Sequence, residues 1–490
     1  MGAALSAGIG SAASSLIIAI YSVAHAPESQ SCYSRVDQQL NFQGRNMSRY
    51  QRSQEILSRN SLHIPGGVVS TNRAVQPPIV FQKAAGAWMW DADGHRYIDY
   101  HAAFGPYVLG HGDDHVNNAV RQVIDEGRSL YGSGTTELEG QLAEAVCNAV
   151  PFLDSIQVLN SGSEATYQAL RLARAATGRS HIIKPQGGYH GWHNDVACNL
   201  MTPIPEVGKR RVADEYPFLP ISAGIPSGHS DLVHIVNFND LDSVEAMCKK
   251  YTIAALITEP VLQNIGIVHP LPGYLEGLRS LADKYGFILI FDEVKTGFRH
   301  ALGGYSILSG VTPDLVVYGK AIANGYPIAV VGGKKELMDL FVASDPSRRV
   351  LLAGTYNGHP VPTAAAIATI ERLAEGDGAV YRSLENLGQR MQRGLEDILR
   401  KNDLTAVVAR QGSAFCIYFM DHLPVDWHDV IQHHDAELDA ELRTKLLDSG
   451  VYFFQLPVKQ CSISAAHTEE DIDATLYAVE TSLAAIHCRH

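Results

Sequence analysis

Between residues 115 and 365, short apolar runs alternate with stretches whose apolar residues recur with the period of a helix. The runs carry few charges, which is typical of strands that are buried on both faces. This order of elements favours a mostly parallel sheet with helices on both of its faces. The predicted strands are residues 155–159, 181–184, 253–258, 287–291, 315–318 and 328–331, and the predicted helices are residues 116–126, 138–150 and 165–176.

The segment before this region predicts a small antiparallel element. Residues 79–90 alternate and are rich in aromatic side chains, and Asp91-Ala-Asp-Gly94 is typical of a hairpin turn before a further strand at 96–100. Residues 48–57 predict an amphipathic helix ahead of it.

The C-terminal part predicts a long helix followed by a segment that contains both helices and strands. Pro360 predicts the start of a long helix that ends near Glu375, and an α+β segment follows from about Tyr381. We therefore expect an α/β fold with two domains. The large domain is predicted at residues 115–365, and the small α+β domain is predicted from residues 47–114 together with residues 366–490.

Residues 1–46 differ in composition from the rest of the chain. An apolar stretch ends in Ala24-His-Ala26, which matches a small-x-small cleavage site, but no Lys or Arg precedes the stretch. It is also too short and too interrupted by Ser and Gly to span a bilayer. We expect a disordered or non-native extension, with the folded protein beginning near Met47.

Composition narrows the class of protein further. The chain has 490 residues, of which 46% are hydrophobic and 19% charged, and its net charge is −13 without a long basic run. Nucleic acids and membranes are therefore not expected as partners. The seven cysteines are scattered and form no CxxC pair, so neither a metal site nor a disulfide framework is indicated, and a cytoplasmic protein is the default.

Two residues near the ends of predicted strands are candidate catalytic residues. Lys320 follows an apolar run after one small residue, and Asp292 ends another such run. A lysine past a buried strand can lose its proton by desolvation and attack a carbonyl, and a nearby aspartate can hold a heterocyclic nitrogen protonated. Pyridoxal phosphate chemistry needs both groups. The alternative is that Lys320 is a solvated loop lysine.

Two glycine-containing loops add to this pair. Asn160-Ser-Gly-Ser-Glu164 lies between a strand and a helix, where Gly162, Ser161 and Ser163 suit a phosphate group, although an ordinary helix cap explains the same pattern. Tyr189 lies in the second loop and can stack on a flat ring. Its neighbour His190 is a possible ligand or, alternatively, a hydrogen-bonded structural histidine.

Two further segments carry polar groups near predicted element ends. Glu259 follows the predicted strand at 253–258, at the edge where parallel sheets bind ligands, although an acid at a helix start is a common alternative. Thr355 is a small hydroxyl donor just after Gly354 and before the helix that Pro360 starts, where a plain turn is the alternative.

From about Ile64 to Ile486, the chain resembles the class III (subgroup II) aminotransferases, which depend on pyridoxal phosphate and have fold type I. Within them it is most similar to the glutamate-1-semialdehyde 2,1-aminomutase-like branch. The matching stretches are 66–73, 90–100, 160–165, 189–191, 291–294, 318–320, 353–355 and 466–472.

The resemblance implies roles for individual residues. Lys320 would hold the cofactor as a Schiff base and later move a proton, and Asp292 would pair with the ring nitrogen. For the rest, the resemblance places Val294 and Tyr189 on the two ring faces, Gly162 and Ser163 at the phosphate with Thr355 of the second subunit of a homodimer, Glu259 and Asn264 near the ring hydroxyl, and Arg73 at the substrate carboxylate.

Three positions depart from the branch. Lys459 aligns with a glutamate of the aminomutase, Lys295 stands where methionine is common, and Phe104 replaces a tryptophan of the pocket. We therefore expect an aminotransferase that moves an amino group between a carboxylate-bearing amine, such as a β- or ω-amino acid, and a keto acid or aldehyde. The alternatives are the intramolecular aminomutase reaction and a non-catalytic protein of this fold.

Overall fold

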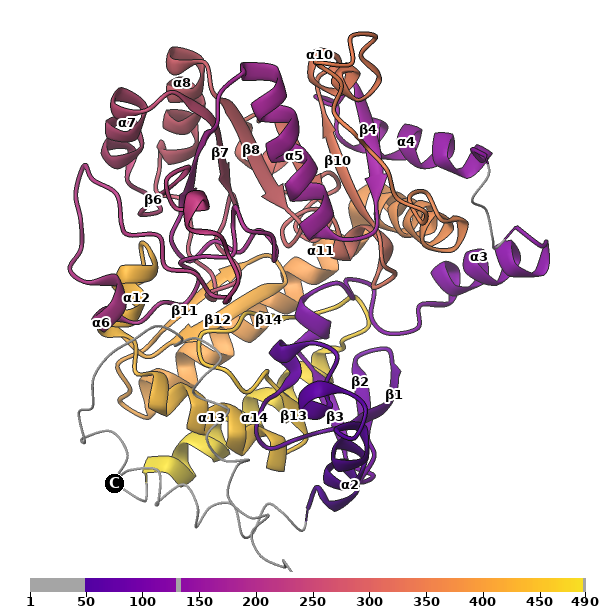
Figure 1. Cartoon of the computed structure of the whole chain (residues 1–490). Coiled ribbons are helices and arrows are strands. Elements are labelled where there is room, and N and C mark those ends of the chain that lie inside the picture. Colours follow the sequence, from indigo (N-terminus) through magenta and orange to yellow (C-terminus); the bar gives the residue numbers. More distant parts are fainter. Residues whose placement is uncertain (1–48, 129–133, 488–490) are drawn as a thin grey trace, which may run out of the picture.

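The structure, a computed structural model, describes residues 49–128 and 134–487 (Figure 1). The predicted extension at residues 1–46 lies outside the described residues. A large sheet with its helices fills the upper half of the view, and a smaller part below it combines the indigo N-terminal and the yellow C-terminal segments (Figure 1). Among the described helices, none has the length and apolar composition required to cross a bilayer.

The larger sheet confirms the predicted mostly parallel arrangement. Its strands are, in order across the sheet, β4 (Ser155–Leu159), β10 (Ala329–Gly333), β9 (Leu315–Tyr318), β8 (Ile288–Glu293), β7 (Ile253–Thr258), β5 (His181–Pro185) and β6 (Val233–Val236). β10 runs antiparallel to both of its neighbours, whereas the other neighbouring strands are parallel. β6 is a strand that the sequence analysis did not include.

Both faces of this sheet are buried, as the uninterrupted apolar runs predict. Neighbouring residues of one strand point to opposite faces, and Leu256 and Ile257 of β7 accordingly belong to two different hydrophobic clusters. Helix α5 (Gly162–Thr177) contributes to the cluster on one face, and α7 (Leu241–Lys250) and α8 (Tyr274–Tyr285) contribute to the other. The helices therefore cover the sheet from both sides.

The smaller part joins segments that lie far apart in the sequence. A four-stranded sheet has the order β1 (Phe81–Ala85), β2 (Trp88–Asp91), β3 (Arg96–Asp99) and β13 (Val451–Tyr452), with β13 parallel to β3. The hairpin between β2 and β3 is confirmed. Treating residues 79–90 as one alternating stretch was wrong, because Gly86 has φ +58 and turns the chain back between β1 and β2.

Helix α11 (Pro360–Lys401) starts at the predicted proline and connects the two parts. Its early turns contact α3 (Asp114–Asp125) and α4 (Glu137–Ala149), and it also contacts α14 (Glu469–His487). The predicted end near Glu375 coincides with a break, since residues 375–378 have non-helical backbone angles. The chain then continues as a helix, and the domain boundary at 365/366 stays a prediction.

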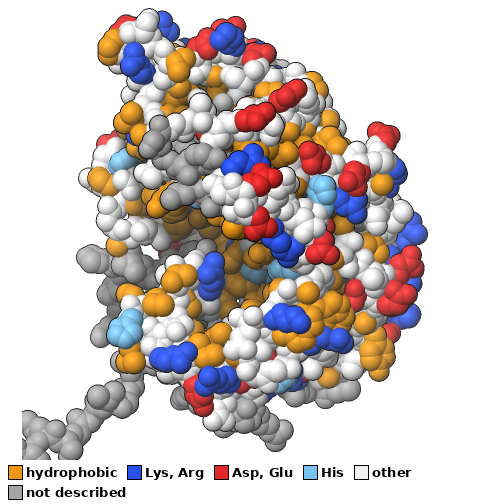
Figure 2. Space-filling view, turned by 90° about the vertical axis from the view of Figure 1, so that its right-hand side faces the viewer, with side chains coloured by type: hydrophobic (Ala, Val, Ile, Leu, Met, Phe, Trp, Pro, Cys, Tyr) orange, Lys and Arg blue, Asp and Glu red, His pale blue; other side chains and the backbone are white. Residues whose placement is uncertain are grey.

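The structure describes six further α-helices and three further strands. The helices are α2 (Gln51–Asn60), α6 (Ile204–Val207), α9 (Tyr305–Ser309), α10 (Lys335–Met338), α12 (Trp427–His433) and α13 (Ala436–Asp448), and β11 (Val407–Gln411), β12 (Ala414–Tyr418) and β14 (Cys461–Ser462) form a third sheet. Figure 2 shows a face that is hollowed near its middle, with hydrophobic side chains inside the hollow and charges of both signs around it.

Candidate active site

Two adjacent strands bring Lys320 and Asp292 to the same edge of the large sheet. Asp292 lies near the end of β8, and Lys320 follows β9 after Gly319. β8 and β9 are parallel neighbours, with Asp292 opposite Val317. Lys320 has φ +49, a backbone conformation that is uncommon for residues with a side chain, and it starts the short 3-10 helix η6 (Lys320–Ala323). The carboxyl ends of parallel strands are where such sheets bind ligands.

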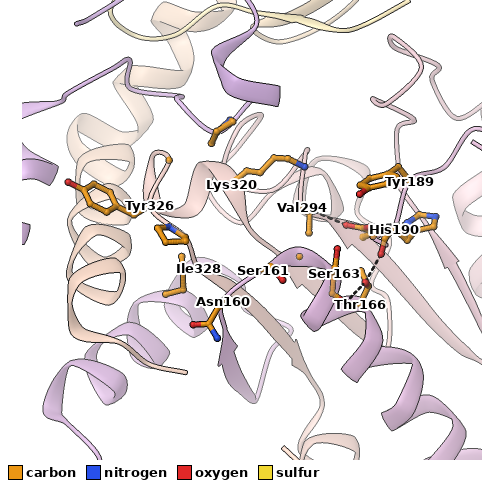
Figure 3. Close-up of a pocket in the computed structure, with 16 residues that line it drawn as sticks. Asn160, Ser161, Ser163, Thr166, Tyr189, His190, Val294, Lys320, Tyr326 and Ile328 are labelled. Atoms are coloured by element: carbon orange, nitrogen blue, oxygen red, sulfur yellow. Dashed lines mark hydrogen bonds and ion pairs between the residues drawn. The ribbon is translucent and has the colours of Figure 1, made fainter. Parts of the chain in front are cut away.

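A cavity of about 270 Å³ lies at this edge. Figure 3 shows the Lys320 side chain reaching over Val294 toward Tyr189, with Ser161 and Ser163 on the other side of Val294. The sequence-predicted residues that line the cavity are Ser161, Gly162, Ser163, Tyr189, His190, Asp292, Val294 and Lys320. The structure therefore gathers residues from four separate strand ends around one space.

The amine of Lys320 belongs to a side chain that lines the cavity. Burial lowers its pKa below the usual lysine value, while Asp292 and Glu259 act in the opposite direction and offset part of the effect. Among the described residues, no hydrogen-bond or ion-pair partner holds the Lys320 nitrogen. A lysine with a lowered pKa and an unoccupied amine in a cavity can attack a carbonyl carbon.

Asp292 is held rigidly and is 3% exposed. Its Oδ2 pairs with Nδ1 of His190 at 2.8 Å, and its Oδ1 accepts the backbone N–H of Val294 at 3.0 Å. Thr166 Oγ1 in turn donates to the carbonyl oxygen of His190 at 2.5 Å. A carboxylate fixed in this way can hold a proton on a ring nitrogen placed in the cavity. A direct role for His190 in cofactor binding stays a prediction.

Helix α5 points its N-terminus into the cavity, which suits an anion. Ser161 is its N-cap, and the Ser161 hydroxyl accepts the N–H of Glu164 at 3.3 Å. The ordinary helix cap that the sequence suggested as an alternative is therefore present, and Ser161 also lines the cavity. Two glycines allow close packing at this end of the helix, because neither has a side chain. A Cβ on Gly162 would lie 3.0 Å from Val294, and a Cβ on Gly191 would lie 2.7 Å from Ser163 Oγ.

Glu259 does not line the cavity, but it contacts Tyr189, which does. Its Oε1 accepts Tyr189 N–H and Asn264 Nδ2 at 3.0 Å each, and its Oε2 accepts Gln263 N–H at 2.9 Å. Glu259 therefore anchors the backbone of the loop that carries Tyr189. The predicted places of Glu259 and Asn264 near the ring hydroxyl stay predictions.

The three predicted substrate residues, Arg73, Phe104 and Lys459, and the predicted phosphate residue Thr355 are not among the residues that line the cavity. Arg73 is exposed in the 3-10 helix η3 (Thr71–Arg73) and does not line the cavity, and Thr355 is also exposed. Phe104 packs edge to face on His101, with ring centroids 4.2 Å apart. Lys459 Nζ donates to the carbonyl oxygen of Asn264 at 2.9 Å. The roles proposed for these four positions from the sequence stay predictions.

Some cavity residues were not singled out from the sequence. Asn160 and Thr166 line the cavity. They belong to the loop at 160–164 and to the helix after it, so this motif could have indicated them from the sequence. Tyr326 and Pro106 carry no local signal of this kind, because they lie outside the strand-end motifs and reach the cavity only through the fold.

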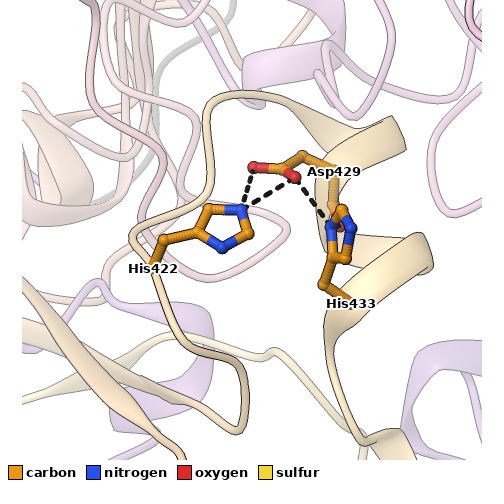
Figure 4. Close-up of side chains that lie close together, drawn as sticks. All are labelled: His422, Asp429 and His433. Carbon is orange, nitrogen blue, oxygen red and sulfur yellow. Dashed lines mark hydrogen bonds and ion pairs between the residues drawn. The ribbon is translucent and has the colours of Figure 1, made fainter.

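A separate cluster on α12 and the loop before it combines His422, Asp429 and His433 (Figure 4). His422 Nε2 lies 3.0 Å from Asp429 Oδ1, and His433 Nδ1 lies 2.9 Å from the same oxygen. The carboxylates of Asp421 and Asp429 accept hydrogen bonds from the His422 ring, and this raises the pKa of His422 above its usual value. Asp429 Oδ2 also accepts the backbone N–H of Val425 at 3.0 Å, and we interpret the cluster as a hydrogen-bond network.

Comparison with known proteins places the chain in a family. Residues 69–481 match the model of the class-III aminotransferases. Glutamate-1-semialdehyde 2,1-aminomutase of Syntrophomonas wolfei is 37% identical over 441 residues, which cover 89% of this chain and 98% of that protein. The chain therefore belongs to the class-III aminotransferase family.

Solved structures agree with this assignment. An omega-transaminase from Sphaerobacter thermophilus has a TM-score of 0.81 and 29% identity, covering 89% of this chain and 98% of its own. A transaminase with pyridoxal phosphate bound has a TM-score of 0.79 and 26% identity, covering 90% and 98%. The chain thus has fold type I, and it is an enzyme that depends on pyridoxal phosphate and acts on small molecules.

The residues present fit this cofactor. Gly162 and Ser163 at the N-terminus of α5 line the cavity, where backbone N–H groups can bind a phosphate, and Asp292 and Lys320 line the same cavity. When bound, pyridoxal phosphate supplies an aldehyde carbon that bonds to amines and a ring that takes up electron density from the substrate. We expect Gly162, Ser163, Tyr189, Asp292 and Lys320 to hold it.

Proposed function

We propose that this enzyme transfers an amino group between an amine that carries a carboxylate and a separate keto acid or aldehyde. The observation that carries this proposal is the position of Lys320. Its amine lies in the cavity with a lowered pKa, at the same sheet edge as Asp292. Amino transfer needs an amine that can form and release a bond to carbon and then accept a proton.

Five residues of the chain have separate roles in the proposed amino transfer. Lys320 Nζ would take a proton from the substrate carbon and later return it, and Asp292 would hold a proton on the ring nitrogen of bound pyridoxal phosphate. Tyr189 and Val294 would contact the ring and limit its movement. His190 keeps Asp292 in place through the 2.8 Å hydrogen bond, so that the carboxylate does not need to reorganise during the reaction.

The second candidate is the intramolecular reaction of glutamate-1-semialdehyde 2,1-aminomutase. The 37% identity to a protein of that name, over 98% of its length, favours it. Lys459 supports the intermolecular reaction instead, because that branch carries a glutamate at the aligned position. A reversed charge beside the substrate changes which intermediates the site retains.

One assay separates the two candidates. The purified enzyme is supplied with glutamate-1-semialdehyde and no other amine or carbonyl compound. The intermolecular proposal expects negligible 5-aminolevulinate and expects turnover only when a donor amino acid and an acceptor such as pyruvate or 2-oxoglutarate are both present. Efficient formation of 5-aminolevulinate from the single substrate would refute it in favour of the mutase.

Lys320 can be tested directly. Reduction of the cofactor-loaded enzyme with borohydride fixes the cofactor to the amine that carries it, and peptide mapping should find the label on Lys320. Lys320→Ala should abolish turnover while keeping the fold. A label on another lysine would show that the assignment is wrong.

We also propose that the enzyme works as a homodimer with composite sites. Thr355 is exposed, and its neighbours Leu351 and Tyr356 are 68% and 63% exposed, which is unusual for large apolar side chains. A second subunit would cover them. Mixing inactive Lys320→Ala with inactive Thr355→Ala chains should restore part of the activity, whereas a fully active monomer in sedimentation would contradict the proposal.

A further inference from the structure

The hydrogen-bond network of His422, Asp429 and His433 has the composition of a zinc site (Figure 4). Each residue offers one ligand atom, and these three atoms lie within 4.8 Å of one another. Asp429 and His433 are four residues apart on α12 and therefore share one face of the helix, while His422 comes from the loop before it. Imidazole nitrogens and carboxylate oxygens are ligands that Zn²⁺ takes in proteins.

The spacing of the ligand atoms is close to the spacing around a tetrahedral zinc ion. His422 Nε2 lies 3.0 Å from Asp429 Oδ1, and His433 Nδ1 lies 2.9 Å from the same oxygen. A zinc ion with bonds of roughly 2.0–2.1 Å separates its ligand atoms by about 3.3 Å. Each nitrogen therefore needs to move away from the oxygen by only about 0.3–0.4 Å to admit the ion.

The His422 ring faces a carboxylate with each of its two nitrogens. Nδ1 lies 2.6 Å from Asp421 Oδ1, and Nε2 faces Asp429. When Nδ1 carries the ring proton and donates it to Asp421, the lone pair of Nε2 points at the Asp429 carboxylate. Two lone pairs at this distance repel each other, and a cation between them removes the repulsion. A carboxylate on the far nitrogen is also the usual partner of a histidine that binds a metal.

The cluster is open to solvent but anchored at its carboxylate. The side chains of His422 and His433 are 43% and 46% exposed, whereas that of Asp429 is 8% exposed. Asp429 Oδ2 accepts the backbone N–H of Val425, so the carboxylate is in place before an ion arrives. A neutral imidazole carries its proton on either nitrogen, and His433 can therefore offer Nδ1 to an ion. Water can reach the fourth position.

Helix α12 also holds a segment that is distant in the sequence. Trp427 Nε1 donates to the carbonyl oxygen of Thr202 at 2.8 Å. The Arg210 guanidinium donates to both oxygens of Asp426, the N-cap of α12, at 2.5 and 2.8 Å. An ion that joins the loop before α12 to the helix would therefore also support residues 202–210.

We propose that His422, Asp429 and His433 bind one Zn²⁺ ion per chain, with water as the fourth ligand. Two imidazoles favour zinc over Ca²⁺ and Mg²⁺, which take oxygen ligands. The ion fastens the loop before α12 to the helix and stabilises this part of the fold. The three residues do not line the cavity at the sheet edge, so the proposal is independent of the reaction that the enzyme catalyses.

The test measures zinc binding directly. The holoenzyme, purified without a histidine tag, is treated with a chelator, dialysed, and titrated with zinc in competition with a chromophoric chelator. The wild type should bind one zinc per chain with a dissociation constant on the order of micromolar or lower. His422→Gln and His433→Gln should each weaken binding at least about tenfold, because even groups that only orient a ligand contribute roughly 10–100-fold.

A matched control and a spectrum make the result specific. His115 is 45% exposed and faces a single carboxylate, Glu371, at 3.5 Å, so His115→Gln should keep the wild-type affinity. X-ray absorption of the zinc-loaded wild type should show only nitrogen and oxygen neighbours at about 2.0–2.1 Å, whereas a cysteine would add sulfur at about 2.3 Å. Circular dichroism shows which variants are folded, and the wild-type spectrum decides the matter if a variant is not.

Four outcomes would overturn the inference. They are a wild type that binds no zinc at about 100 µM, a folded His422→Gln or His433→Gln variant with wild-type affinity, a loss of affinity in His115→Gln, and sulfur among the neighbours of the bound zinc. Each of these results concerns zinc alone, and none bears on the proposed amino transfer.

Discussion

Replacing Glu259 with glutamine should weaken both the fold around the cavity and the binding of the cofactor. The carboxylate accepts N–H groups from Tyr189, Asn264 and Gln263. A glutamine whose oxygen serves Tyr189 and Asn264 must point its own NH2 group at the N–H of Gln263. Two donors then face each other at a residue that is 1% exposed.

The size of the effect follows from these three bonds. Losing one hydrogen bond to a charged group costs about 1.5–3 kcal/mol, and the other two weaken to roughly half their strength on a neutral acceptor. A neutral amide is easier to bury than a carboxylate, which offsets part of the loss. The free energy of unfolding should therefore fall by about 2–4 kcal/mol. Affinity for pyridoxal phosphate should fall about tenfold, because the Tyr189 loop loses its anchor.

Guanidinium unfolding of the cofactor-free protein and a spectroscopic titration with pyridoxal phosphate measure the two effects. Asn264→Ala is the matched control, since it removes one donor and leaves the carboxylate with the other two. It should cost about 1 kcal/mol. If Glu259→Gln has the unfolding midpoint and the cofactor affinity of the wild type, Glu259 does not anchor this loop.

Three further predictions concern other parts of the site. Asp292→Asn should keep the cofactor bound but slow the half-reaction by about 10²-fold or more, because a neutral amide no longer holds the ring proton; near-normal single-turnover rates would contradict this. Gly162→Ala should weaken cofactor binding by crowding Val294, whereas Gly140→Ala, in an open part of α4, should stabilise the protein by up to about 1 kcal/mol; equal cofactor affinity in the two variants would refute the crowding argument. Burial lowers the pKa of His467 to about 4, so the unfolded chain binds its proton first and stability should fall between about pH 6.5 and pH 4; His467→Gln should make that loss shallower, as denaturant titrations across this range would show.

The sequence predicted the large sheet and the centre of the site for a shared physical reason. An apolar run that is buried on both faces stands out by composition alone, and the residue that follows it necessarily lies at the sheet edge. Lys320, Asp292 and Gly162 could therefore be placed from their positions after strands, and the structure brings them to one cavity. The turn at Gly86 was missed, because an alternating run looks the same whether it forms one strand or two.

What only the tertiary structure decided is how the residues behind the cavity are paired. Lys459 and Asn264 are 195 residues apart, and their hydrogen bond joins the C-terminal segment to the loop after β7. No local pattern encodes such a contact, since it depends on how the two parts of the molecule pack. By itself the sequence determined the fold class and the candidate lysine, because the apolar runs and their alternation with helical patterns are local features of the chain. The fold decided that Glu259 anchors the backbone of Tyr189, because this hydrogen bond joins two segments that are 70 residues apart.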